Sequence, residues 1–274
     1  MLALTAKALR MIKKAYVDTP SGQIHYYYGG PTDQTPIIFM HQNVSGAKTY
    51  LPTLTQLAEK HHCIALDLPG FGGSFDPPEF DSISRMQEYT LEFIDALGFR
   101  EFHTFGSHTG AAMAAEMASL YPDRVKTCMM MGATLLNEEQ AIPFRESFSG
   151  SVGPSHDAAY LKITWDYIYN LGGNLDLDNM NDELSAALRA WKVRGMIYRC
   201  VWDYRFDLFI EGIKCPTLLI CAPDDVLYIG HQNTAAALAQ AKVVDVKGTN
   251  FEPYFDPDGV SRGIIEFLAD NGFA

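Results

Sequence analysis

The sequence predicts an α/β fold, with a mostly parallel, doubly wound sheet and a helical cap inserted into it. Three observations lead to this prediction. Short continuous apolar runs alternate with stretches of helical periodicity, as in repeated strand–helix–strand units. A Gly-x-x-x-Gly turn separates one of these runs from a helix of small residues, within 104–113. A later stretch, roughly 137–211, loses the alternation and holds all three tryptophans.

Charge and composition narrow the classes of partner. The 274 residues carry a formal net charge of -12, which argues against nucleic acid or an anionic membrane as a partner. The five cysteines form no Cys-x-x-Cys pair and lie mostly in or beside apolar runs, so we expect buried free thiols and a reducing compartment.

Targeting signals are not expected either. No run approaches the ~20 apolar residues of a membrane span. Basic residues interrupt the first stretch, Met1 to Lys14, so it does not match a signal peptide. The chain is therefore predicted to be cytoplasmic and to act on a small molecule, and a homodimer stays open.

The first part of the chain, 1–136, is predicted to begin the α/β core. Extended patterns flank a Pro/Gly turn at 19–22, which indicates a β-hairpin. The elements expected after it are a strand at 36–41, a helix at 49–61, a strand at 63–66, a helix from Asp81 that Gly98 closes, and strands at 101–105 and 125–131.

A helical cap is predicted over 137–212, and the core is predicted to resume over 213–274. The cap is rich in aromatic residues and in helical pattern. The resumed core is expected to contain a buried strand from Cys215 that ends in the acids Asp224 and Asp225, a helix at 234–240, a strand at 243–246 and a helix at 260–268.

The turn at 106–110 has the outline of a nucleophile elbow. In such an elbow the middle residue of G-x-S-x-G stands clear on a tight strand-to-helix turn between small neighbours. Here the middle residue is His108. Right-handed crossovers place the ends of parallel strands on one edge of a sheet, where open α/β sheets keep their sites. We therefore expect the functional site around His108.

Four segments carry a resemblance to a known family. They are His41-Gln42-Asn43, the run from Ala65 to Ser74, the elbow, and Ala222-Pro223-Asp224-Asp225. With these segments the chain resembles the cap-bearing branch of the α/β-hydrolase superfamily, which includes epoxide hydrolases, haloalkane dehalogenases, C–C bond hydrolases and small esterases. The resemblance covers nearly the whole chain. It implies the fold, whereas this branch hosts many reactions.

The resemblance breaks at three functional positions. His108 stands where the family carries its nucleophile, Asn250 stands at the position of the usual catalytic histidine, and Gln42 stands where glycine is common. Asp225 matches the family's usual acid, with Asp224 as the neighbouring alternative. The resemblance therefore implies an atypical triad and does not carry over the serine mechanism.

The residues present favour a base over a nucleophile. An acyl-serine route needs a hydroxyl and a base, and Asn250 cannot accept and release a proton. Ser107 lies one residue from the elbow apex and is expected to point away from the pocket. The positive end of a helix disfavours imidazolium, so His108 is expected to be a neutral ring that can act as a base. We expect Asn250 to face His108, with Asp225 orienting Asn250 from behind.

Backbone groups are expected to complete the site. The N–H groups of Thr109 and of Gln42 or Asn43 would form an oxyanion hole, because they depend on backbone geometry alone. His41 is expected to support the turn beside this hole. The cap residues expected to bind substrate are Trp165, Tyr198 and Trp202.

The sequence thus predicts an enzyme that uses His108 as general acid/base on a small apolar or aromatic substrate. The reaction would be hydrolysis by direct water attack, or lysis or cyclisation by proton transfer. The alternatives are a cofactor-free oxygenase and a non-catalytic ligand-binding protein. No cofactor and no metal are expected, since no metal-binding spacing of histidine and cysteine is present. His61, His62 and His231 are expected at the surface.

Overall fold

The computed structural model describes residues 11–78, 81–148 and 152–273. The described residues form one sheet of eight strands in the order β1-β2-β4-β3-β5-β6-β7-β8. β1 and β2 pair antiparallel and β2 pairs antiparallel with β4, whereas all later pairs are parallel. The strands are β1 (Lys13–Asp18), β2 (Gln23–Gly29), β3 (Ile37–Met40), β4 (Cys63–Leu66), β5 (Phe102–Ser107), β6 (Val125–Met131), β7 (Thr217–Cys221) and β8 (Lys242–Asp245).

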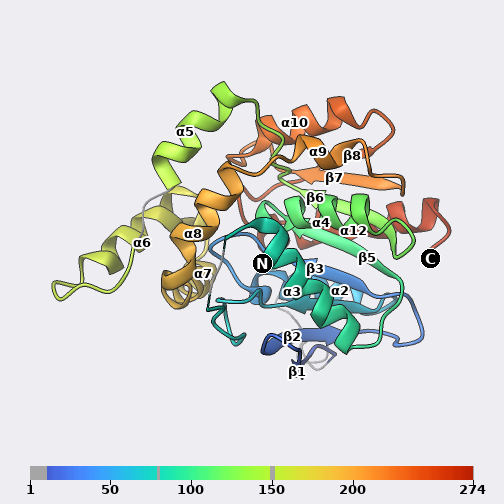
Figure 1. Cartoon of the computed structure of the whole chain (residues 1–274), viewed down its shortest axis with the longest axis horizontal. Helices are drawn as coiled ribbons and strands as arrows, with labels where there is room; N and C mark the ends of the chain where they lie inside the picture. The colour runs from blue at the N-terminus through green and yellow to red at the C-terminus, as the bar shows by residue number, and fades with distance from the viewer. Residues whose placement is uncertain (1–10, 79–80, 149–151, 274) are drawn as a thin grey trace.

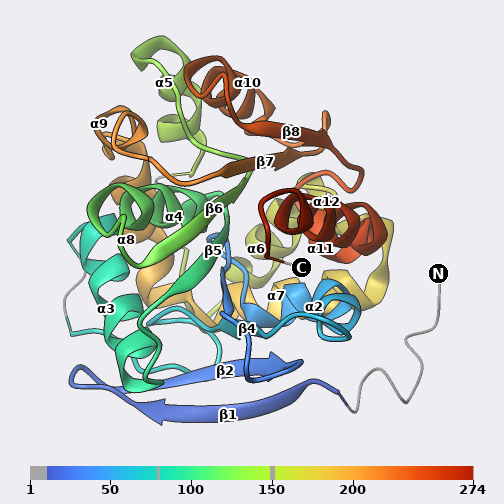
Figure 2. The same cartoon turned by 90° about the vertical axis from the view of Figure 1, so that its right-hand side faces the viewer.

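Helices cover both faces of the sheet, which confirms the predicted fold class. Figure 2 shows α3 (Ile83–Ala96) and α4 (Thr109–Leu120) on one side of the strands, and α2 (Leu51–Leu57) and α12 (Pro257–Asp270) on the other. The two layers enclose two hydrophobic clusters, one on each face of the sheet. β3 and β5 are buried along their whole length, because helices cover both of their faces.

The stretch between β6 and β7 is helical. Among its described residues there is no strand. It contains α5 (Glu138–Phe148), α6 (Ala159–Asn170), the 3-10 helix η2 (Gly173–Leu175), α7 (Leu177–Arg189), α8 (Trp191–Trp202) and α9 (Asp207–Ile210). Figure 1 shows α5 to α8 together at the left of the sheet. These helices occupy the stretch that the sequence assigns to the cap, and the division of the chain into three domain segments stays a prediction.

Two helices differ from the sequence prediction. The helix expected at 49–61 is a 3-10 turn, η1 (Ala47–Tyr50), followed by the short α2. The helix expected at 234–240 begins earlier, as α10 (Tyr228–Ala237). The buried residues of α10 are Gly230, His231 and Thr234, so no apolar stripe indicates where it starts.

Three histidines expected at the surface are buried. His61 and His62 lie at the end of the connection from α2 to β4, and His62 packs edge-on against Phe99. His231 stacks on Tyr228 within α10. The prediction is wrong for all three, and at His62 the covering residue Phe99 is distant in sequence.

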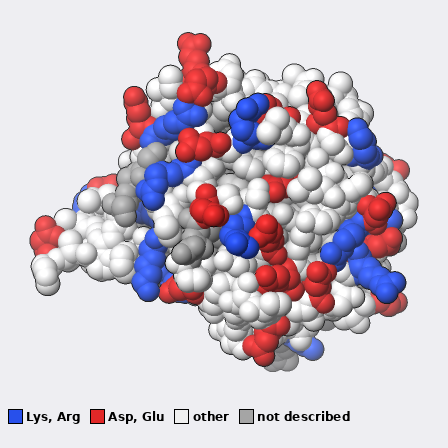
Figure 3. Space-filling view, in the orientation of Figure 1, with Lys and Arg blue, Asp and Glu red and all other residues white. Residues whose placement is uncertain are grey.

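Two further observations concern the charges on the surface and the length of the helices. Figure 3 shows acidic and basic side chains interspersed over one face of the molecule. No helix in the described part of the chain combines the length and apolar character needed to cross a bilayer.

Candidate active site

The site is built on a strained turn between β5 and α4. His108 has φ 47° and ψ -104°, a conformation that side-chain-bearing residues rarely adopt. The turn needs glycine on both sides. A Cβ atom on Gly106 would overlap the carbonyl oxygen of Gly110, and one on Gly110 would overlap the carbonyl oxygen of Met40 in β3. The backbone therefore has the elbow geometry expected from the sequence, with an imidazole at its apex.

The His108 imidazole pairs directly with a buried carboxylate. Its Nε2 lies 2.7 Å from Oδ2 of Asp225, which follows β7. The other carboxylate oxygen of Asp225 accepts the backbone N–H of Leu227 at 2.6 Å. Asp225 has a fully buried side chain, whereas Asp224 is exposed. Asp225, and not Asp224, is thus the acid that contacts His108.

Glycine makes room for this contact. A Cβ atom on Gly132, just after β6, would lie 2.6 Å from the His108 Nε2. The Nε2 edge of the imidazole therefore packs against the Gly132 backbone and the Asp225 carboxylate. A larger residue at 132 would displace the ring.

The pairing determines which ring nitrogen is available. A carboxylate accepts a proton donor, so Nε2 carries the hydrogen of the neutral imidazole and Nδ1 keeps its lone pair. No described residue forms a hydrogen bond with Nδ1. The side chain is 12% exposed, so the ring is not sealed from the cavity beside it. Nδ1 is the atom able to accept a proton from a bound molecule.

Asn250 is placed differently from the sequence expectation. Its side-chain amide donates to the carbonyl of Leu171 at 2.9 Å and accepts from the N–H of Val226 at 3.3 Å. Asp225 does not orient Asn250, because His108 reaches the carboxylate directly; that part of the prediction is wrong. Asn250 lines the same cavity as His108 and ties the cap, through Leu171, to the loop after β7.

Three residues beside the cavity have backbone N–H groups without an acceptor among the described residues. Gln42, Asn43 and Thr109 all line it. Their N–H groups bond to no acceptor among the described residues. Thr109 begins α4, so its N–H is one of the unpaired donors of that helix end. These groups can hold a negative oxygen, as the predicted oxyanion hole requires.

His41 supports this loop from behind. Its Nδ1 donates to the carbonyl of Gln42 at 2.8 Å and its Nε2 accepts the N–H of Leu68 at 3.0 Å. Both nitrogens are used, the residue is fully buried, and burial lowers its pKa. His41 therefore holds a single neutral tautomer and positions Gln42, as the sequence predicts, and does not reach the cavity.

Ser107 faces away from the cavity. Its hydroxyl accepts from the Tyr50 hydroxyl at 2.8 Å, on the opposite side of the elbow. Ser107 is buried and does not line the site. The expectation that this hydroxyl points away is confirmed.

Aromatic side chains of the cap close the cavity. Tyr198 and Trp202 of α8 line it, stacked with an interplanar angle of 4°. The Tyr198 hydroxyl donates to the carbonyl of Asn43 at 3.0 Å and also bonds the Tyr167 hydroxyl. Trp165 is 37% exposed and does not line the cavity, so its predicted place is wrong. The lining residues that sequence reasoning missed are Thr134, Phe144, Phe148, Leu171, Val201, Val226 and Leu227.

Comparisons with known proteins agree with this geometry. A family model described as the α/β hydrolase fold matches residues 35–151, which include β3, the elbow and α4. This chain has the α/β-hydrolase fold, and the matched segment, which is less than half of its length, is similar to that family.

Relatives of this α/β-hydrolase-fold protein carry several enzyme names. It is 26% identical over 246 residues to a protein of Pseudomonas savastanoi pv. phaseolicola assigned by name as a carbamate hydrolase (RutD), with 85% of this chain and 93% of that protein covered. It is 28% identical over 153 residues to a protein of Mycobacterium phage D29 named as a non-heme haloperoxidase, with 50% of this chain and 55% of that protein covered. The chain thus spans about half the length of the phage relative.

A solved structure confirms the fold over nearly the whole chain. A bacterial membrane phospholipase A superposes with a TM-score of 0.81 at 20% sequence identity, with 97% of this chain and 88% of that chain covered. At this identity the likeness shows the fold alone.

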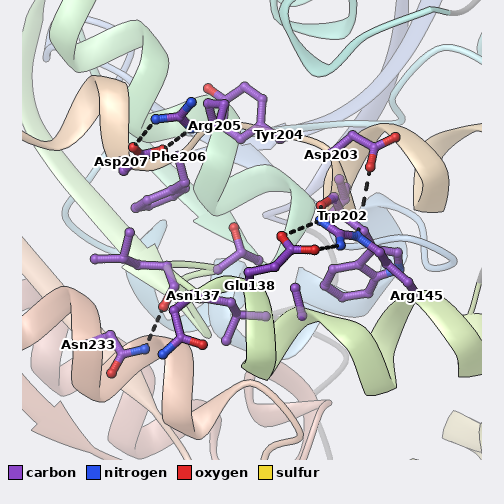
Figure 4. Close-up of a pocket in the computed structure, with 15 residues that line it drawn as sticks. Asn137, Glu138, Arg145, Trp202, Asp203, Tyr204, Arg205, Phe206, Asp207 and Asn233 are labelled. Atoms are coloured by element: carbon purple, nitrogen blue, oxygen red, sulfur yellow. Dashed lines mark hydrogen bonds and ion pairs between the residues drawn. The ribbon is translucent and has the colours of Figure 1, made fainter.

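The hydrolase-fold protein has a second, larger cavity beside the first. Its volume is about 490 Å³, and Thr134, Val201 and Trp202 line both this cavity and the His108 cavity. Figure 4 shows its charged lining, where Arg145 of α5 pairs with Glu138 and Asp203. We call this cavity the vestibule.

A buried carboxyl group that the sequence analysis missed lies behind Asp225. Glu252 begins α11 (Glu252–Phe255), two residues after Asn250. Among the described residues, Cys221, Asp225 and Glu252 form one group whose side-chain ligand atoms lie within 4.8 Å of one another. Burial raises the pKa of the Cys221 thiol well above its usual range, which keeps it a neutral thiol and a poor metal ligand.

Proposed function

We propose that this protein is an enzyme in which Nδ1 of His108 acts as general acid/base on a small, mostly apolar or aromatic substrate. One observation carries the proposal: the His108 imidazole is paired through Nε2 with Asp225, and its other nitrogen is left free in an aromatic cavity. This is the tautomer and orientation that a general base requires.

The groups around His108 suit hydrolysis by direct water attack. Nδ1 accepts a proton from water while the water oxygen attacks a carbonyl carbon. The oxyanion that forms would accept the N–H groups of Thr109 and of Gln42 or Asn43. Asp225 stabilises the imidazolium, which then returns its proton to the leaving group. No covalent enzyme intermediate is needed, so this route does not require a serine nucleophile.

The cavity dimensions define how substrate enters. The His108 cavity has a volume of about 30 Å³, which is room for about two water molecules. A substrate therefore needs space from the neighbouring vestibule. Trp202 lines both cavities, so rotation of its side chain would join them.

The superfamily relatives support hydrolysis as the first reaction class. The relative with the longest alignment described above is named as a carbamate hydrolase, and carbamates present the carbonyl carbon that this route needs. Lysis or cyclisation would use the same first step, removal of a proton by Nδ1, with the oxyanion hole holding an enolate or alkoxide.

The test compares His108→Gln with Ser107→Ala on a panel of aryl carbamates, aryl esters, lactones and aromatic compounds with an acidic C–H bond. Glutamine keeps a donor toward Asp225 but cannot take up a proton. Turnover by His108→Gln is expected to fall at least about a hundredfold, the lower limit for loss of a general base. Ser107→Ala serves as the matched control and should retain turnover.

Three other results would redirect or end the proposal. Equal turnover by His108→Gln and the wild type would remove His108 from the mechanism. Oxygen uptake that matches substrate loss would indicate a cofactor-free oxygenase instead of a hydrolase. Tight binding of panel compounds without chemical change over long incubation would indicate a ligand-binding protein.

A further inference from the structure

Glu252 is a second buried carboxyl group in contact with the acid of the site. It is 1% exposed and lies at the start of α11. One of its oxygens, Oε1, accepts the backbone N–H of Ala222 at 3.2 Å, and a carboxyl oxygen of Glu252 lies within 4.8 Å of one of Asp225. The Glu252 carboxyl group thus lies beside that of Asp225, which in turn contacts the His108 ring at the cavity.

Two buried carboxylates in contact cannot both keep a negative charge. Their mutual repulsion and the loss of water around them hold a proton on one of the two. A hydrogen bond between two carboxyl groups also needs that proton, because ionised carboxylates only accept.

The donors decide which group carries the proton. Asp225 receives the His108 Nε2–H and the Leu227 N–H, both shorter than 2.8 Å. Glu252 receives the longer bond from Ala222, and its own backbone N–H also favours the charged form. The negative charge is therefore better stabilised on Asp225. Burial, followed by the charge of Asp225, raises the pKa of Glu252 well above its usual range.

The other titratable groups around Glu252 do not change this balance. Cys221 stays a neutral thiol, and the nearby Tyr50 hydroxyl is buried, with burial raising its pKa. His108 contacts Asp225 directly, and His231 of α10 lies near it, but burial lowers the pKa of His231 and disfavours its positive form. No lysine or arginine in the described part of the chain forms an ion pair with Asp225 or Glu252.

We propose that Glu252 is a neutral carboxylic acid that donates a hydrogen bond to Asp225 and so keeps the His108–Asp225 pair at one negative charge. It acts on His108 through Asp225, as a positioning residue. With two negative charges behind it, His108 would hold its proton and could not serve as a base. With one, the imidazole can both take up and release a proton.

The positioning role rests on the proposed function of His108, whereas the protonation of Glu252 does not. Spectroscopy therefore tests this inference without a turnover assay. The failure of His108→Gln to lose activity would end the proposed function and leave the protonation result unchanged.

Infrared difference spectroscopy gives the direct measurement. The wild type minus Glu252→Gln spectrum, taken between pH 6 and 9, is expected to show the carbonyl band of one protonated carboxylic acid throughout. In case the variant does not fold, the acid band can be followed across this range in a Glu183→Gln background, because burial raises the pKa of Glu183 to about 7 and its band would otherwise overlap. A carboxylate band in place of the acid band would overturn the proposal.

NMR titration of the His108 ring, assigned with His108→Gln, gives the second measurement. Glu252→Gln replaces a neutral donor with a neutral donor, so the His108 midpoint should move by less than about 0.3 pH units. Glu252→Leu removes the donor and should raise the midpoint by about half a unit or more. A fall of about one unit in Glu252→Gln would show that a negative charge had been removed, and would contradict the proposal.

Glu116 provides the matched control. It is another buried glutamate, on α4, and it does not line the His108 cavity. Its carboxylate accepts a hydrogen bond of 2.6 Å from the Tyr204 hydroxyl. Glu116→Gln should leave both the His108 midpoint and the Glu252 acid band unchanged. A His108 shift in Glu116→Gln equal to that in Glu252→Leu would indicate a general packing effect and overturn the specific role.

Discussion

The molecule contains two histidine–aspartate pairs of the same length in different surroundings. His25 of β2 lies 2.7 Å from Asp67, and His108 lies 2.7 Å from Asp225. Both pairs are largely buried. Distance and burial therefore do not distinguish them.

The neighbours of the first pair make it structural. The Asp67 carboxylate also accepts the N–H groups of Ala47 at 2.8 Å and Gly73 at 3.0 Å, so it joins two loops to β2. Burial alone would raise the pKa of Asp67, but the hydrogen bond from His25, the nearby His41 and these two N–H groups lower it below its usual value. Its oxygens are committed to holding the chain.

The neighbours of the second pair leave reactive groups free. His108 sits in a strained backbone conformation, its Nδ1 has no partner among the described residues, and unpaired N–H groups of Gln42 and Thr109 line the same cavity. The comparison shows that a histidine–aspartate contact indicates a catalytic site only where the second ring nitrogen faces a cavity that holds complementary donors.

The strongest test of this contrast is Asp225→Asn. The amide group can present its NH2 to Nε2, which forces Nε2 to accept and moves the ring hydrogen to Nδ1. The base is then blocked, and turnover of a substrate found in the panel should fall by roughly a thousandfold or more. Circular dichroism and the melting temperature should show a folded protein. Turnover above a tenth of the wild-type value would show that the tautomer is not set by Asp225.

Asp67→Asn should lower stability and retain turnover, the reverse of what is expected for Asp225→Asn. An amide offers one oxygen to three donors, so at least one buried N–H loses its partner, and the free energy of unfolding should fall by about 3 kcal/mol at pH 7. Urea denaturation measures this difference. Turnover per folded molecule should be retained. A loss below about 0.5 kcal/mol would mean that Asp67 does not hold the loops.

The Asp67 contribution should also depend on pH in one direction. Because its folded-state pKa is lowered, the stabilisation is fully present above the unfolded-state pKa of about 3.9. It is lost as the pH falls through the lower folded-state value. The gap in unfolding free energy between wild type and Asp67→Asn should therefore be constant above about pH 5 and narrow below pH 4.

A smaller effect is expected at the cap beside the first pair. Glu183 of α7 lines the same surface cavity as His25 and Asp67, and burial raises its pKa to about 7. A raised folded-state pKa stabilises the fold below the unfolded-state value of about 4.3, and this stability is lost as the pH rises through about 7. Glu183→Gln stays neutral, so it should gain about 2 kcal/mol over the wild type between pH 5 and pH 8.

Urea denaturation at these two pH values measures the Glu183 effect. Asp182→Asn is the matched control, since Asp182 is the adjacent acid and pairs with Lys48 at the surface. It should show little change in the pH dependence of stability. A Glu183→Gln gap that does not vary between pH 5 and pH 8 would contradict the prediction.

Much of the fold could be predicted from the sequence because its signals are local. The apolar run at 125–131 is β6, and the glycines at 106 and 110 indicate the elbow because close backbone contacts there leave no room for a Cβ atom. The acid after β7 was also predictable, since the ends of parallel strands meet at one edge of a sheet. These features depend on residues close together in the chain or on general rules of α/β topology.

The partners within the site required the tertiary structure. Asn250 lies within the predicted site, but only the structure shows that it bonds Val226 and Leu171 and leaves Asp225 to His108. Glu252 gives no sequence signal, because a glutamate two residues beyond Asn250 reads as an ordinary exposed acid. The sequence by itself determined the fold, the elbow and the acid. Which ring nitrogen is free and where the buried proton lies depend on contacts between residues more than a hundred positions apart, such as His108 and Asp225, and only the packed structure decides these.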